Sequence, residues 1–328
     1  MKTFAKLLAV LLALTVLCGC QQNEPTPTTV PTEAPTQPAP TLFPEETYPE
    51  GIMTERYLKT HDLQDVFDNI PIAPISGVKE DGSFFNLPAV GGCSVLQGVC
   101  TDGKYMYLIL EGSNVSAGDE ILKKGHIVSK VDMSTWEIVL QSEPMSLDHG
   151  NSMCYNTKTN QLIVANCNDV DTTDNQNNTK LITFIDPETL EIVDTKLLDF
   201  AINAIEYSPD YNLYVVGIKG SSAAFAVLDE NFVELGYYEG HNLELSPQDV
   251  DCDKDYIYVG NSGTGSNHLG NEVVKIYNWD GEYQGAFKVA SVAEHEALLN
   301  YGGKYYIGFY TNGGRIHEIT YDFSLLGK

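Results

Sequence analysis

Five short stretches of the sequence each begin with a hydrogen-bonding side chain and continue as an alternating strand. They are QGVCTD, NSMCYN, NAIEYS, QDVDCD and HEALLN, and they begin at Gln97, Asn151, Asn203, Gln248 and His295. Side chains two apart share a strand face, and the second residue after each polar one is apolar in all five stretches. A polar side chain at the start of such a face either contacts a ligand or forms a hydrogen bond with a backbone group that has no other partner.

Imidazole and carboxyl groups gather around these openings. His295 stands between two glutamates, and His149 lies two residues before Asn151. An imidazole beside carboxylates suits proton transfer or recognition of a polar ligand. The predicted ligand-binding set is Gln97, His149, Asn151, Asn203, Gln248, Asp249, His295 and Glu296. The amides could equally satisfy the unpaired edge of an innermost strand, and this alternative stays open.

The same stretches open a repeat. Their first residues lie 54, 52, 45 and 47 positions apart. Each is followed by a second strand, such as KYMYLIL, and a third, such as HIVSKVD, and in four repeats by a fourth. Four antiparallel strands at this period predict an all-β fold, a five-bladed β-propeller with four-stranded blades.

The fifth repeat lacks a fourth strand, and a spare strand precedes the first repeat. This spare strand, Ser83–Leu87 (SFFNL), is predicted to become the outer strand of blade five and so to close the ring. Further upstream, apolar residues spaced i, i+3, i+4, i+7 over 63–70 predict a short helix on the rim.

The first strand of each blade should line the central channel, so the five polar openings should ring its mouth. The segments between second and third strands open on the same face. They are Glu111–Gly125, Cys167–Thr179, Lys219–Ser222, Asn261–Asn271 and Thr311–Gly314. Ring and loops together predict a concave ligand site at this end of the channel.

The fourth repeat, PQDVDCDKDYIYVGNSG followed by NEVVKIYNWDGEYQGAF, resembles an NHL-type propeller repeat. The resemblance implies blade architecture from Gln97 to Asp322 and carries almost no information about function. Metal-dependent lactonases with six blades also resemble this fold, and their central metal takes carboxylate and asparagine ligands. Five repeats and a ring of mostly neutral amides argue against that chemistry. A hydrolase or lyase, metal-dependent or not, is the alternative to a non-catalytic binding module.

Other catalytic and metal patterns are missing from the sequence. HEALL at His295 lacks the second histidine of a zinc-protease helix, and no G-x-S-x-G motif marks a serine hydrolase. The segment NDVDTTDNQNN (168–178) is acidic but lacks the register of an EF-hand loop. Because the segment is acidic, Ca²⁺ bound to it is the one cofactor that the sequence suggests.

The first twenty residues predict a lipoprotein signal peptide. Lys2 and Lys6 flank the start of an apolar run, Leu7–Leu17, which is too short to span a bilayer. The run ends in LCGC, which resembles the bacterial lipobox. This resemblance implies cleavage before Cys20 and a lipid on its thiol. An ordinary secretory signal is the alternative.

Residues 21–50 hold eight of the fifteen prolines and predict an extended linker, which at about 3.1 Å per residue reaches roughly 90 Å. The propeller domain spans residues 51–328. A net charge of −26 argues against nucleic-acid binding, and the five cysteines after Cys20 are expected to be mostly buried free thiols. The sequence thus predicts a lipid-anchored protein on the extracellular side of the cell membrane that binds a glycan, a peptide or a partner protein.

The predicted anchor can be tested by changing Cys20→Ala. Because the lipid on Cys20 is the only predicted membrane attachment, the variant should move from the membrane fraction to the soluble fraction. Cys18→Ala is the matched control and should stay with the membrane. Retention of the Cys20→Ala protein in the membrane fraction would show that the lipoprotein assignment is wrong.

Overall fold

In a computed structural model of the chain, the described residues are 56–57, 71–79, 84–167, 178–219, 224–239, 245–263, 272–289, 293–311 and 313–326. The predicted signal peptide, the linker and the rim helix over 63–70 lie outside these residues. Among the described residues, no helix has the length and apolar character needed to cross a membrane.

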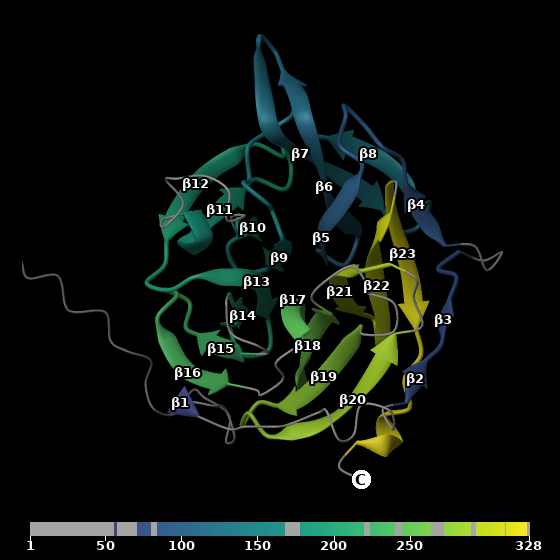
Figure 1. The fold of residues 1–328 in the computed structure, drawn as a ribbon, viewed down its shortest axis with the longest axis vertical. Helices are drawn as coiled ribbons and strands as arrows, with labels where there is room; N and C mark the ends of the chain where they lie inside the picture. Colours follow the sequence, from purple (N-terminus) through teal and green to yellow (C-terminus); the bar gives the residue numbers. More distant parts are fainter. Residues whose placement is uncertain are drawn as a thin grey trace, which may run out of the picture. The chain divides into compact units, whose positions relative to one another are not determined.

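Five blades of antiparallel strands surround one axis as a propeller, and one backbone pairing joins blades five and one into a single sheet (Figure 1). In blades one and two the strands are β5 (Val95–Thr101), β6 (Tyr105–Ala117), β7 (Glu120–Asp132), β8 (Glu137–Gln141), β9 (Ser152–Asn156), β10 (Gln161–Ala165), β11 (Leu181–Ile185) and β12 (Ile192–Leu197). In blades three and four they are β13 (Ile202–Ser208), β14 (Leu213–Ile218), β15 (Ala224–Leu228), β16 (Glu234–Glu239), β17 (Leu245–Cys252), β18 (Tyr256–Gly263), β19 (Val273–Asn278) and β20 (Tyr283–Val289). Blade five holds β21 (His295–Tyr301), β22 (Lys304–Thr311) and β23 (Gly313–Ile319). The predicted all-β, five-bladed architecture is confirmed.

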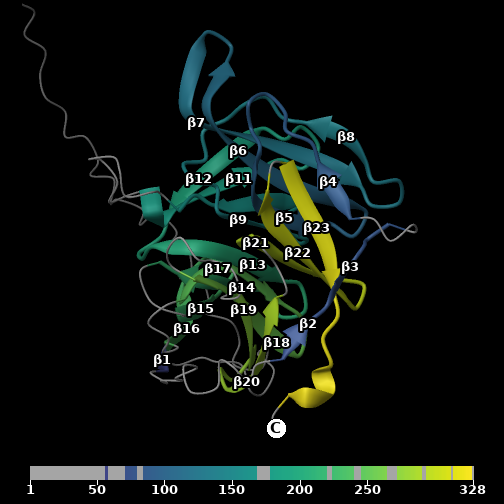
Figure 2. The ribbon, with the colours of Figure 1, turned by 45° about the vertical axis from the view of Figure 1, so that its right-hand side comes forward.

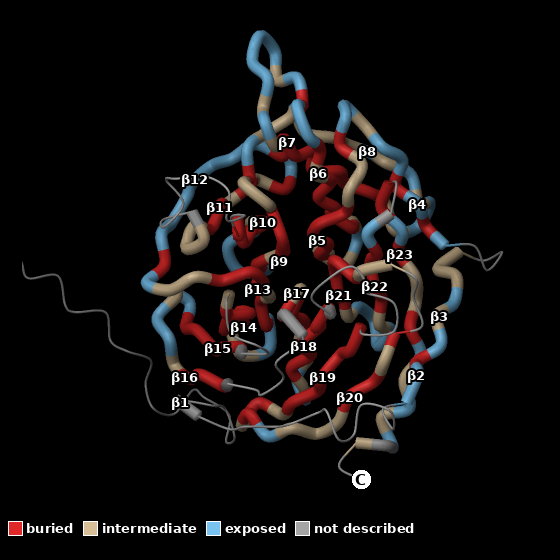
Figure 3. The backbone as a smooth tube through the Cα atoms, viewed as in Figure 1, coloured by how far each residue is buried: buried red, intermediate tan, exposed pale blue. Residues whose placement is uncertain are grey.

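Apolar side chains fill the spaces between neighbouring blades. Strands alternate their side chains between two faces, so each blade contributes to two such cores. Between blades one and two, Cys100 and Val128 pack with Met153 and Val164. Figure 3 shows these inner strands as buried and much of the outer rim as exposed. The cysteines of the described residues are free thiols, as expected: Cys93, Cys100, Cys154, Cys167 and Cys252.

The chain before blade one runs along the outer edges of three blades (Figures 1 and 2). Strand β1 (Arg56–Tyr57) pairs in parallel with β16 of blade three, and β2 (Ile72–Ala73) pairs in parallel with β20 of blade four. On blade five, β3 (Ile75–Ser76) and β4 (Phe85–Leu87) pair antiparallel with β23. Backbone donors on these outer edges therefore have partners. An unpaired edge could instead pair with another chain and promote aggregation.

Strand β4 lies where the sequence placed the outer strand of blade five. Phe85 and Leu87 lie opposite Ile316 and Gly314, and both are buried in the core that blade five shares with blade one. This is the pairing that the predicted ring closure requires. That the ring depends on it stays a prediction.

The segment Glu111–Gly125 was predicted to be a loop. Strands β6 and β7 instead continue through it as a hairpin. Its glycines, serines and asparagine suggested a loop, yet Val115 is buried against the base of the hairpin. Gly125 permits this packing, since a Cβ there would lie 2.5 Å from the Cβ of Val115. The tip projects beyond the blades as an exposed arm (Figure 3).

The closure predicts that β4 is needed for stability. Phe85→Ala and Leu87→Ala each remove a buried side chain and should lower the free energy of unfolding by roughly 3 kcal/mol. Asn86→Ala, an exposed neighbour on the same strand, is the control and should change it little. Removal of residues 51–90 should abolish cooperative unfolding in a thermal melt. A truncated chain that melts cooperatively near the intact temperature would contradict the closure.

Candidate functional site

Three of the five polar openings of the inner strands sit at β-bulges, and Asn151 lies immediately before β9. The ladder of β5 and β6 skips Gln97, that of β13 and β14 skips Asn203, and that of β17 and β18 skips Gln248. In blade five the skipped residue is Glu296, not His295. The sequence alignment was therefore one residue out of register in the fifth repeat, because an inserted bulge residue leaves no sequence pattern of its own.

Amide side chains at the openings of the inner strands connect neighbouring blades near the axis. The Nδ2 of Asn151 donates to the backbone oxygens of Asn203 at 2.7 Å and Gln248 at 2.9 Å. The Nδ2 of Asn203 in turn donates to the oxygen of Pro247. Asn151 and Asn203 are only 3% and 7% exposed, so the expected solvated ring is instead an internal network. Gln97 is equally buried, and the role of the ring in ligand binding stays a prediction.

His295 has a different partner from the one expected. Its Nδ1 lies 2.6 Å from a carboxylate oxygen of Glu272 at the start of β19, and both side chains are fully buried. Its Nε2 faces Gly260, where a Cβ would lie only 2.4 Å away. Of the flanking glutamates, Glu294 instead accepts a hydrogen bond of 2.7 Å from Nε2 of Gln248. His295 thus joins blades four and five through Nδ1, and its predicted role in ligand binding stays a prediction.

His149 belongs to a charged cluster at the base of the β6–β7 hairpin. The Oε2 of Glu111 lies 3.0 Å from Nδ1 of His149, 3.3 Å from Nζ of Lys124 and 3.6 Å from Nε2 of His126. Burial opposes ionisation of Glu111, but the imidazoles and the ammonium group outweigh it and hold the pKa of this carboxyl well below its ordinary value.

A metal ion does not fit this cluster, because the ammonium group of Lys124 lies 3.2 Å from the nitrogen of His149 that would be a ligand. Across the described part of the chain, no group of three or more His, Cys, Asp or Glu side chains is arranged to hold a metal. The segment 168–177, which makes up nearly all of the suggested Ca²⁺ loop, lies outside the described residues.

Asp249 also serves the interior. Its carboxylate accepts hydrogen bonds of 2.7 Å from Oγ of Ser152 and 2.6 Å from the backbone nitrogen of Leu298. Burial raises the pKa of Asp249 to about 7, although both hydrogen bonds favour the ionised form. This side chain therefore links blades two, four and five at the axis.

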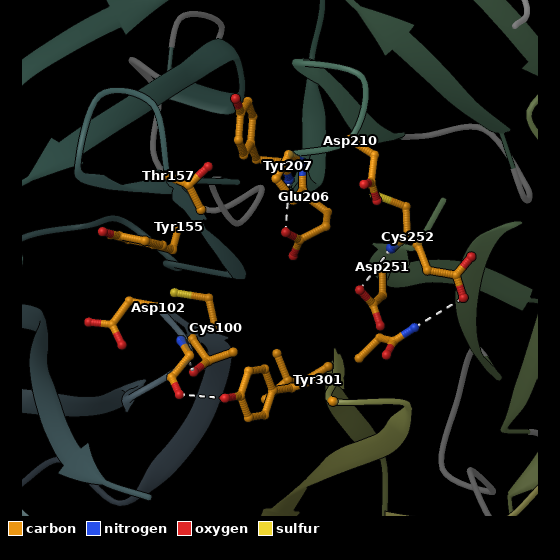
Figure 4. Close-up of a pocket in the computed structure, with 17 residues that line it drawn as sticks. Cys100, Asp102, Tyr155, Thr157, Glu206, Tyr207, Asp210, Asp251, Cys252 and Tyr301 are labelled. Atoms are coloured by element: carbon orange, nitrogen blue, oxygen red, sulfur yellow. Dashed lines mark hydrogen bonds between the residues drawn. The ribbon is translucent and has the colours of Figure 1, made fainter. Parts of the chain in front are cut away.

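A cavity of about 320 Å³ opens at the other end of the inner strands (Figure 4). It is lined by the last residues of β5, β9, β13, β17 and β21 and by the turns that follow them. Its lining residues are Cys100, Thr101, Asp102, Gly103, Tyr155, Thr157, Glu206, Tyr207, Pro209, Asp210, Asp251, Cys252, Asp253, Leu299, Asn300, Tyr301 and Gly302. None of the predicted ligand-binding residues is among them.

Two carboxyl groups from neighbouring blades point toward the open middle of this cavity, those of Glu206 and Asp251 (Figure 4). Each accepts a hydrogen bond of 2.8 Å from the next backbone nitrogen, that of Tyr207 and Cys252 respectively, and Asp251 also accepts one from the backbone nitrogen of Asn300. Burial raises the pKa of both groups well above the ordinary range, and repulsion between Glu206 and Asp251 raises that of Glu206 further. Burial and mutual repulsion therefore favour the protonated form of these carboxyl groups.

Two of the three aspartates that line the rim of the cavity, Asp102 and Asp253, are bound by their own turns. Asp102 accepts hydrogen bonds from the nitrogen of Tyr105 at 2.7 Å and the hydroxyl of Tyr107 at 2.8 Å. Asp253 accepts equivalent bonds from the turn after β17 and from the hydroxyl of Tyr258 at 2.7 Å. Their carboxylates hold the turns in place, and Asp210 lies exposed at the rim, so Glu206 and Asp251 are the pair of carboxyl groups in the middle of the cavity.

Sequence reasoning missed this pair, although a signal existed. Three residues after the bulge, three blades carry Cys100, Cys154 and Leu299, which suit a buried face. Blades three and four carry Glu206 and Asp251 at the same position. A carboxyl group where the other repeats are apolar marks either a paired charge or a site.

No protein-family model and no curated protein sequence matches this chain. Among solved structures, Kuenenia stuttgartiensis hydrazine synthase is similar with a TM-score of 0.40 and 14% identity, over 68% of this chain and 57% of that one. The Neurospora crassa Pan2 WD40 domain is similar with a TM-score of 0.39 and 10% identity, over 71% of this chain and 90% of that one. Neither likeness bears on the activity of this chain.

Proposed function

We propose that this propeller is a non-catalytic binding module whose ligand enters the cavity at the ends of the inner strands. The observation that carries the proposal is the pair Glu206 and Asp251, two carboxyl groups that face an open cavity and lack a cationic partner among the described residues. Buried carboxyl groups are normally paired with a cation or fully hydrogen-bonded. A cavity of about 320 Å³ lies at the lower end of the range for small-ligand sites.

The module would act outside the cell, held to the membrane by a lipid on Cys20. The lipobox-like LCGC and the proline-rich stretch 21–50 support this location, since together they supply an anchor and a spacer. A glycan, a peptide or a partner protein could each place a small group in the cavity.

A hydrolase or lyase is the second candidate. The same two carboxyl groups favour it, because a protonated and an ionised carboxyl group side by side can serve as general acid and general base. Turnover of a bound ligand would distinguish this candidate from the binding module.

Blocking the cavity tests the proposal. Thr157 lies exposed at the cavity rim, so Thr157→Trp should narrow the entrance without disturbing the core (Figure 4). Ligands found by a thermal-shift or NMR screen of small polar molecules should bind this variant at least about tenfold more weakly, a loss of about 1.4 kcal/mol. Thr195→Trp on the exposed strand β12 is the control. Equal binding by all three proteins would place the ligand site elsewhere and end the proposal.

A further inference from the structure

Resting on the proposed function, we infer that the cavity between Glu206 and Asp251 binds a protonated primary amine. The amine would be a small alkylamine or the side chain of a lysine. Its ammonium group would lie between the two carboxyl groups, and its carbon chain would lie along the aromatic wall toward the cavity mouth.

The charge of the lining favours a cation. Five of the lining residues are acidic, and among the described residues no lysine, arginine or histidine lines the cavity. Two close carboxyl groups in a partly dehydrated space repel each other unless a proton or a cation lies between them. An ammonium group brings one positive charge and three donors, which suits two carboxylates that face a common space.

The hydrogen-bonding state of the pair also points to a missing donor. Asp251 is only 4% exposed, and its partners are the backbone nitrogens of Cys252 and Asn300. Glu206 accepts only the bond from Tyr207 through Oε1, so its Oε2 has no hydrogen bond among the described residues. This oxygen faces the cavity and can accept a bond only from water or a ligand (Figure 4).

The remaining wall suits the carbon chain of an amine. Tyr155, Tyr207 and Tyr301 stand around the opening, and Leu299 adds an aliphatic surface. The hydroxyls of Tyr155 and Tyr207 are bound to Asn160 and Asn212 at 2.6 and 2.9 Å, which fixes the rings. Aromatic faces attract cations and also cover methylene groups, so they favour an alkylammonium over a bare ion.

A metal ion fits this cavity less well than an ammonium group. A hard divalent cation takes six to eight oxygen ligands in Ca²⁺ sites, whereas Glu206 and Asp251 are the available pair here. No larger set of His, Cys, Asp or Glu among the described residues is placed to hold a metal.

The test compares 1,4-diaminobutane with 1,4-butanediol, which has the same carbon chain and no charge, by calorimetry on the full chain. The diamine should bind, and the diol should bind at least about tenfold more weakly. A peptide with an internal lysine and the same peptide with acetyllysine separate a side-chain source from a free amine. Ca²⁺ and glucose are the remaining probes.

Glu206→Gln and Asp251→Asn keep the shape of each side chain and remove its charge. Each should weaken diamine binding at least about tenfold, whereas Glu137→Gln, an exposed acid on blade one, should not. Because burial disfavours the charged forms of Glu206 and Asp251, both neutral variants should fold, and thermal melts check this.

The affinity should also depend on pH. Protons compete with the amine for the pair, since the pKa of both carboxyl groups is raised, so binding should weaken at least about tenfold from pH 8 to pH 5. The amine keeps its own charge over this range. The titratable groups that line the cavity or act on the pair are Cys100 on β5, Asp102 on the turn after it, Cys154 and Tyr155 on β9, Tyr207 on β13, Asp210 on the turn after it, Asp249, Cys252 and Asp253 on β17 and its turn, and Tyr301 on β21.

The outcomes separate this inference from the function on which it rests. Tighter binding of the diol, glucose or Ca²⁺ than of the amines, or unchanged diamine affinity in both neutral variants, would overturn the amine inference. If such a ligand is still lost in Thr157→Trp, the binding cavity stands and only its ligand class is wrong. If neither the diamine nor the lysine peptide binds at millimolar concentration, the inference is also overturned.

Discussion

Five inner strands converge on one axis. The inner edge of each has no neighbouring strand to pair with, so its backbone groups need other hydrogen-bond partners there. The amide of Asn151 meets this constraint most directly, because it donates to carbonyl oxygens of blades three and four at once. Ser152 extends the network, since its Oγ accepts from the nitrogen of Ile205 at 3.1 Å and donates to Asp249 at 2.7 Å. The strands approach so closely that a Cβ at Gly98 would lie 3.0 Å from the nitrogen of Met153. The arrangement of the five blades depends on these hydrogen bonds between short polar side chains and neighbouring blades.

The same constraint explains why the two ends of the inner strands differ. At the bulge end, His295 pairs with Glu272 and Gln248 pairs with Glu294. Gln97 Oε1, Asn203 Oδ1 and His295 Nε2 at the same end are buried without a hydrogen-bond partner among the described residues. At the other end, the strands diverge into turns that satisfy their own backbones through Asp102 and Asp253. Glu206 and Asp251 also accept hydrogen bonds from backbone nitrogens there, but the Oε2 of Glu206 is left facing the cavity. We therefore propose the cavity at this end as the ligand site, while the role of the ring at the bulge end in ligand binding stays a prediction.

Much of the fold could be predicted because strand alternation and turn residues leave local patterns. The strand segments of each repeat, the outer strand at Phe85–Leu87 and the free cysteines all followed from such patterns. The bulge in blade five could not be predicted, because a bulge shifts the register by one residue and leaves no sequence pattern. The repeat pattern therefore assigned His295 to the position that Glu296 occupies. The proposed cavity could not be found from the sequence, because a buried polar residue gives the same sequence pattern in either role. Asn151 connects blades, whereas Asp251 faces a cavity.

The central claim is that the buried amides hold the ring together, and the stability of Asn151→Ala tests it most directly. The substitution leaves two buried carbonyl oxygens without their donor, so chemical denaturation should give a free energy of unfolding lower by roughly 2 kcal/mol. Asn231→Ala removes an exposed amide on blade three and should leave it within about 0.5 kcal/mol of the parent. An Asn151→Ala protein as stable as the Asn231→Ala control would contradict the claim and return the ring to consideration as a ligand site.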